Sequence, residues 1–236
     1  MKRFLFFLFL SICISTNAQI KDTVKVSNSD SVCLSKLTGE AYYEFIQYVG
    51  DQFYNTNWTK SDILLANGTM LYDIQLKYNG FLDEVIWMNT NNLRKFKLDK
   101  SSINDFWLKN STTDIIHFKR INVTNTNNPS TEIFVEVGIE GKLSLYIQHK
   151  IKIDGEEDFY LNGHNYLLKS IGPKPLYYIN LQSNNFAMLD KINRINLLKL
   201  FPEHKIEIQK IMRLNHLNLK TPQDLIKLID LLNKIL

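Results

Sequence analysis

The sequence predicts an α+β protein: an antiparallel β-sandwich or barrel-like meander followed by a short three-helix C-terminal segment. The β part rests on a hairpin pattern, because residues 67–88 read as turn, strand, tight turn and strand, and similar units follow. Side chains of a strand point alternately to two faces, so such a meander turns one face toward a core. From Asp190 the apolar period changes from two to 3.6, which predicts helices.

Residues 1–18 have the three parts of a secretory signal peptide. Lys2 and Arg3 form the positive end, residues 4–14 are an apolar run interrupted by Ser11, and Ala18 is a small residue at the expected cut. The run is shorter than the about 20 residues that cross a bilayer as a helix. We therefore expect an exported protein with no transmembrane segment after signal removal. A lipoprotein signal with Cys13 as the acylated residue is the alternative.

Three further regions follow the signal. Residues 19–36 are polar without an apolar period, which predicts a tether; residues 37–189 form the predicted antiparallel β domain, and residues 190–236 the helical segment packing on it. Cys33 is the one cysteine beyond the signal, so the core must hold without an internal disulfide. The formal net charge of +4 includes the basic signal and no long basic run occurs, so we expect no nucleic-acid partner.

The hairpins of the β domain are predicted from their turns. Asn67-Gly68 suits a type I′ turn, which needs positive φ at both central residues, and Asn79-Gly80 marks the next turn. Further strands are expected at residues 85–88, 93–98, 104–108 and 114–122, with a loop at 124–131. The strands at 132–137 and 143–147 are almost wholly apolar, which indicates burial on both faces.

Residues 150–153 are expected to extend the preceding strand, and residues 154–158 to form an acidic loop. After a turn at residues 162–165, the Gly172-Pro173-Lys174-Pro175 run predicts a rigid connection, because proline removes a ladder donor. Residues 176–181 and 186–189 then form the last predicted hairpin.

Three helices are expected after Asp190. The first buries Ile192, Ile195, Leu198 and Leu200, and the second starts at Pro202 with Ile208, Ile211 and Met212 inward. In the third, Thr221 caps the N-terminus, Pro222 occupies the first helical position and Asp224 lies near the positive end of the helix dipole. Its buried face is predicted to hold Leu225, Leu228, Ile229 and Leu232.

Six short segments carry a resemblance to a known group. They are residues 50–54 (GDQFY), 76–84 (LKYNGFLDE), 134–137 (FVEV), 141–146 (GKLSLY), 197–202 (LLKLFP) and 217–220 (LNLK). Together they resemble a family of uncharacterised secreted proteins of Gram-negative bacteria, although Lys77 stands where those proteins often carry arginine. The resemblance implies export and a β domain with a helical C-terminal segment, and it implies no catalytic residue.

Catalytic constellations are not signalled. Asp83 and Glu84 are adjacent, so a strand would point them to opposite faces, and we expect them to be solvated carboxylates at a turn exit. The histidines have no metal-ligand spacing, and the acidic residues 156–158 lack the EF-hand pattern for calcium. We therefore predict no catalytic, cofactor-binding or metal-binding residues and no cofactor.

These observations favour an exported, non-enzymatic binding or structural component of the cell envelope, periplasmic, outer-membrane-associated or secreted, whose partner is an envelope protein or glycan. Two alternatives remain open. One is a carbohydrate-binding module, for which Trp58, Trp87 and Trp107 would supply a stacking platform. The other is a hydrolase whose residues meet only in space, such as Asp83 or Glu84 with His117.

Overall fold

The computed structural model describes residues 37, 39–44, 48–111, 113–125, 128–182 and 185–235. The predicted signal peptide, the predicted tether, Cys13 and Cys33 lie outside these residues. None of the helices that the structure describes combines the length and apolar character needed to span a membrane.

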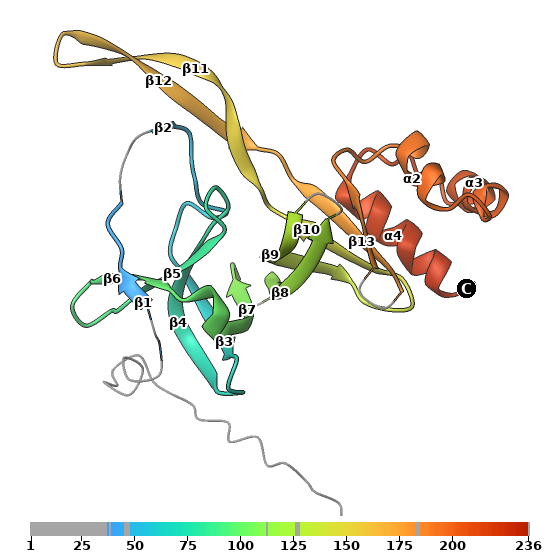
Figure 1. Ribbon diagram of the computed structural model, residues 1–236, viewed down its shortest axis with the longest axis horizontal. Helices are drawn as coiled ribbons and strands as arrows, with labels where there is room; N and C mark the ends of the chain where they lie inside the picture. The colour runs from blue at the N-terminus through green and yellow to red at the C-terminus, as the bar shows by residue number, and fades with distance from the viewer. Residues whose placement is uncertain are drawn as a thin grey trace, which may run out of the picture.

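A large antiparallel sheet dominates the described part of the chain (Figure 1). In the described residues this sheet has eleven strands, in the order β1-β6-β5-β4-β3-β7-β8-β9-β10-β13-β14. Most strands pair with their neighbours in sequence, as in a meander. Their bounds are β1 Gly39–Ala41, β3 Thr59–Leu65, β4 Met70–Asn79, β5 Glu84–Met88, β6 Lys95–Leu98, β7 Ile103–Lys109, β8 Ile115–Asn125, β9 Asn128–Ile139, β10 Ser144–Gln148, β13 Leu176–Gln182 and β14 Asn185–Leu189. The predicted α+β class, with an antiparallel meander before three helices, is confirmed; the sheet remains open, with β1 and β14 at its edges.

The first half of this sheet curls until the β4–β5 turn meets strand β9. The carboxylate of Asp83 in that turn accepts a hydrogen bond from the backbone N–H of Phe134, at 3.2 Å. The N–H of Ile151 donates to the carbonyl of Gly80 in the same turn, at 3.1 Å. Inside the curl, Tyr78, Phe106, Phe118 and Phe134 are fully buried in one aromatic core.

The turn between β3 and β4 differs from its predicted type. Gly68 has a φ of 84°, but Asn67 is not among the described residues with positive φ, so the type I′ prediction was wrong. The N–H of Gly68 donates to the carbonyl of Leu65, and the side chain of Asn67 accepts from the N–H of Thr69. Asn67 therefore acts through its side chain, as in an Asx turn, while Gly68 alone supplies the left-handed residue.

A second, small sheet contains β11 (Ile151–Leu161), β12 (His164–Pro173) and the two-residue β2 (Tyr48–Val49), in the order β11-β12-β2. Strands β11 and β12 form a long hairpin that projects from the molecule (Figure 1), and we call it the arm. The predicted acidic loop at residues 154–158 was wrong, because these residues lie within β11. Residues 151–153 also do not extend β10, since they begin this other sheet. The predicted turn is confirmed, with positive φ at Asn162 and Gly163.

Helices α2 (Arg194–Leu200), α3 (Lys205–Leu214) and α4 (Pro222–Asn233) close the chain, and a single 3-10 turn, η1 (Lys100–Ser102), precedes β7. The cap of α4 is confirmed, because the Thr221 side chain accepts from the N–H of Asp224. The first helix differs from prediction, since Ile195 is 69% exposed and Leu197 is its buried residue. The second helix begins at Lys205 rather than at Pro202.

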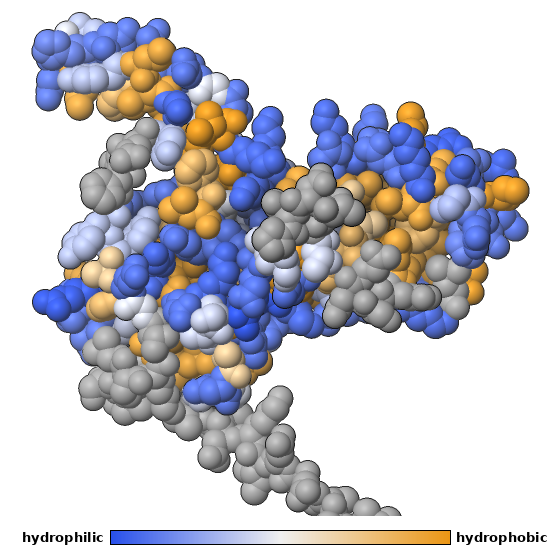
Figure 2. All heavy atoms as spheres, viewed as in Figure 1, coloured by the Kyte–Doolittle hydropathy of each residue, from blue (hydrophilic) through white to orange (hydrophobic). Residues whose placement is uncertain are grey.

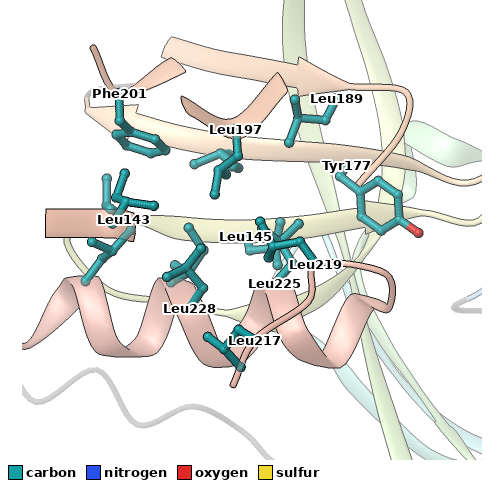
Figure 3. Close-up of a cluster of buried hydrophobic side chains, with 14 of the residues drawn as sticks. Leu143, Leu145, Tyr177, Leu189, Leu197, Phe201, Leu217, Leu219, Leu225 and Leu228 are labelled. Carbon is teal, nitrogen blue, oxygen red and sulfur yellow. The ribbon is translucent and has the colours of Figure 1, made fainter. Parts of the chain in front are cut away.

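The helices pack on the strands β10 and β13, as Figure 3 shows for the cluster around Leu145, Leu197 and Leu228. Every residue of β10 is buried, as predicted. Leu145 and Ile147 face the helical cluster, whereas Tyr146 packs in a second cluster on the opposite face. The side chain of Asn233 at the end of α4 clamps the backbone of Leu143, accepting from its N–H at 2.7 Å and donating to its carbonyl at 2.8 Å.

Candidate functional site

The arm exposes an unusual share of large apolar side chains. Ten residue pairs join β11 to β12, from Ile151↔Pro173 at the root to Leu161↔His164 at the tip, with one register shift between Ile153 and Gly155. An extended strand of this length reaches roughly 35 Å, at about 3.3 Å per residue. The exposed large apolar residues on the arm are Ile153, Phe159, Tyr160, Leu161, Tyr166 and Leu167.

Alternation sorts these side chains onto two faces of the ribbon. Phe159 is directly opposite Tyr166, so the two rings share a face with Leu161. Tyr160, at 73% exposed, lies on the other face with Leu167. Figure 2 shows hydrophobic groups among hydrophilic ones along the arm as it stands away from the rest of the molecule. A two-stranded ribbon is at best marginally stable in water, so large apolar groups that it leaves exposed indicate a contact surface.

Acidic side chains accompany the apolar ones on the arm. Asp154 accepts a hydrogen bond from the Ser170 hydroxyl, and Asp158 accepts one from the Asn165 amide. Alternation places Glu157 on the face opposite to its neighbours Glu156 and Asp158. The three carboxylates therefore do not meet at one point. Among the described residues no cluster of three or more potential metal ligands occurs.

A cleft of about 410 Å³ lies where the root of the arm meets the large sheet. Its lining includes Tyr54, His149, Ile151, Ile171 and Pro173. Aromatic and aliphatic side chains with a few polar groups among them are typical of pockets that bind small molecules.

One titratable pair borders this cleft. The Nε2 atom of His149 lies within hydrogen-bonding distance of Glu136 Oε2, and the ring of Tyr54 meets the imidazole edge-on with centroids 4.4 Å apart. A carboxylate only accepts, so Nε2 is the donor of this bond, and in the tautomer with the proton on Nε2 alone the Nδ1 atom is an acceptor. Burial, followed by the negative charge of Glu136, raises the pKa of Tyr54 to about 12. The pair can hold and orient a proton acceptor at the cleft.

The structure separates the predicted hydrolase residues. His117 pairs with Asp105 at 2.8 Å and stacks on Trp107, and no hydrogen bond or ion pair between described residues joins it to Asp83 or Glu84. Asp83 instead binds Tyr78, Phe134 and Lys100. The prediction that Asp83 is solvated was also wrong, because the residue is only 5% exposed.

The tryptophans do not form the stacking platform that a carbohydrate-binding module would need. Trp87 is buried and stacks on Phe96. Trp58 lies under the ammonium groups of Lys77 and Lys95, at 5.5 and 5.9 Å from its centroid. Trp107 stacks on His117 instead. Each indole is therefore engaged with a different neighbour.

The sequence alone does not indicate two parts of the candidate site. The pair Glu136 and His149 could have been found from register, because β9 and β10 pair next to it at Glu136↔Ile147. The arm is not indicated by its sequence, because acidic residues are depleted in strands and the composition of residues 154–158 is typical of a loop.

Comparison with protein-family models, with curated proteins and with solved structures finds no match for this chain.

Proposed function

We propose that this protein is an exported, non-enzymatic binding component of the cell envelope and that the arm is its contact surface. The observation that carries the proposal is the exposure of Phe159, Tyr160, Tyr166 and their aliphatic neighbours on a projecting ribbon. The proposed export is supported by the signal-like residues 1–18 and by the resemblance to secreted proteins of Gram-negative bacteria.

The construction of the arm suits capture of a protein surface. Aromatic side chains bring a large contact area at a small cost in conformational entropy, and they dominate the energetics of protein interfaces. Strand β11 is also an edge of its sheet, so its free backbone groups are accessible to a partner. The arm therefore combines side-chain anchors with a hydrogen-bonding edge.

A photo-crosslinking residue at Tyr160 tests the proposal in cells that export the protein. Tyr43 is a matched control, because it is 74% exposed against 73% for Tyr160 and follows Tyr42, whose N–H donates to the carbonyl of Lys95 in β6 rather than to the arm. We expect a discrete cross-linked product in the envelope fraction from position 160 and none from position 43. Loss of that product in a Phe159→Ser/Tyr166→Ser variant with an unchanged circular dichroism spectrum would support the arm as the contact surface. Equal products from both positions, or none, would refute it.

A second candidate function, a hydrolase with a site assembled in space, is favoured by the cleft at the root of the arm. There the carboxylate of Glu136 orients His149, an arrangement that can activate a water molecule as a general base. The test is hydrolysis of an activated ester such as p-nitrophenyl acetate by the purified protein and by His149→Gln. If the wild type hydrolyses the ester and His149→Gln does not, the hydrolase is favoured over the binding protein. If both proteins only match the background rate of hydrolysis, the hydrolase candidate is refuted.

A further inference from the structure

We propose that the partner of the arm is a second copy of this chain, which receives the arm at the basic groove of its helical segment. The inference rests on the proposed binding function of the arm and names the partner. It follows from complementary features at two ends of one molecule.

The receiving surface is a groove of about 650 Å³ formed by α2, α3 and the chain that follows α3, and we call it the helical groove. Ile206 on its wall is 85% exposed, and the largely buried Met212 and Leu217 also line it. Three cations also border it: Arg194, Lys210 and Arg213. An exposed isoleucine among cations suits a partner segment that carries apolar and acidic side chains together.

These cations are available for a partner. Within α3 and its cap, His204 and Glu207 form a hydrogen-bonded pair, and none of the ion pairs between described residues uses Arg194, Lys210 or Arg213. On the arm, the same holds for Glu156 and Glu157. Residues 154–170 of the arm carry four carboxylates and one cation, Lys169, which lies opposite Glu156 in the ribbon. The arm and the helical groove are thus complementary in both charge and hydrophobicity.

The two surfaces lie at opposite ends of the molecule, with the arm reaching away from the helices in Figure 1. A copy that docks its arm in a neighbour's helical groove therefore keeps its own groove free. Such a head-to-tail contact is heterologous, and it propagates into rings or filaments rather than stopping at a two-fold dimer.

The alternative of two arms pairing edge to edge is less favourable. Antiparallel pairing of β11 with its own copy would bring the acidic run Glu156, Glu157 and Asp158 against an identical run. Like charges opposite each other destabilise a sheet, and charged edges are a known device against such pairing. The charges on the arm thus favour the basic helical groove over another arm.

A charge-swap experiment tests the inference on the full-length protein recovered after export. The arm variant is Glu156→Lys/Glu157→Lys, and the groove variant is Lys210→Glu/Arg213→Glu. The control Lys60→Glu/Lys227→Glu alters the charge by the same amount as the groove variant at two exposed lysines outside the groove. Sedimentation velocity over a concentration series at low salt measures self-association.

We expect the wild type and the control to associate, and each swapped variant alone to weaken association at least about tenfold. Mixing the arm and groove variants should restore it, because both contacts between unlike copies are then matched: the reversed arm meets the reversed groove, and the wild-type arm meets the wild-type groove. Association should also weaken as salt rises from about 0.05 to about 0.5 M. In the otherwise unaltered protein with the photo-crosslinking residue at position 160, cross-links should fall on peptides of α3.

The outcomes separate this inference from the function it rests on. A wild type that stays monomeric while position 160 cross-links to a different protein would overturn the second-copy partner and leave the binding function intact. A monomeric wild type with no cross-link from position 160 would overturn both. Association that the swapped variants retain, with unchanged circular dichroism spectra, would also overturn the helical groove as the receiving surface.

Discussion

Replacing Asp83 by alanine should be among the most destabilising changes in the large sheet. The Asp83 carboxylate accepts from the Tyr78 hydroxyl at 2.7 Å and from the Phe134 N–H at 3.2 Å, and it pairs with Lys100 at 2.7 Å. Phe134 is 51 residues further along the chain, so this one side chain ties the β4–β5 turn to strand β9. The variant therefore removes one of the polar contacts that join the β4–β5 turn to later strands.

The expected size follows from what the truncation leaves behind. The Tyr78 hydroxyl and the Phe134 N–H are buried, and a buried donor without its acceptor costs about 1–3 kcal/mol. The ammonium of Lys100 is partly exposed and regains water, so it adds little. Alanine also tolerates the positive φ of this position less well than aspartate. Together these effects predict a loss of about 3–5 kcal/mol in the free energy of unfolding.

Asp83→Asn separates the hydrogen bonds from the charge. Asparagine keeps an oxygen acceptor and accepts the left-handed backbone, so it should lose only about 1–2 kcal/mol, mainly through the pair with Lys100. Urea unfolding followed by tryptophan fluorescence measures both variants against the wild type. If the alanine and asparagine variants agree within about 0.5 kcal/mol, the buried donors do not depend on Asp83 and the reasoning fails.

Three further predictions concern other parts of the molecule. Asn233→Ala removes both hydrogen bonds to the Leu143 backbone and should lower the free energy of unfolding by about 1–3 kcal/mol in urea; a change below about 0.5 kcal/mol would show that the clamp is dispensable. Thr221→Ala removes the acceptor for the Asp224 N–H and should cost about 1 kcal/mol, whereas Thr221→Ser should be nearly neutral; equal losses would contradict the capping role. Because the pKa of Tyr54 is raised from 10.0 to about 12, the unfolded chain releases this proton at lower pH than the folded protein, so stability should fall as pH rises through this window and be unaffected below it. Phenolate absorbance of the wild type minus that of Tyr54→Phe reports this titration directly, and a midpoint near 10 would contradict the burial of the phenol.

Local signals were sufficient for the elements whose stability is local. The cap at Thr221 and the buried stripe of α4 follow from residues three and four apart, and the structure has both. The apolar pattern of β10 likewise indicated burial on both faces. These predictions needed no knowledge of distant partners.

Features that depend on distant partners could not be predicted in the same way. The burial of Asp83 requires Phe134 and Lys100, and nothing near Asp83 in the sequence points to either. The arm could not be predicted for another reason. Acidic residues are rare in strands, because most strands pack one face against a core. Both faces of the arm are exposed to solvent, so Glu156 and Glu157 can lie in its strand without being buried in a core.

The arm leaves and rejoins the large sheet at almost the same place, because Gln148 at the end of β10 and Leu176 at the start of β13 are register partners. In topological terms the whole excursion between them is an enlarged hairpin connection. Beyond the register shift at Gly155, its rungs could be deleted or added in facing pairs without disturbing any neighbour in the eleven-stranded sheet. Evolution can therefore change the length and the surface residues of this connection while the large sheet stays the same. We expect homologues to share the sheet and to differ in the partner that the arm binds.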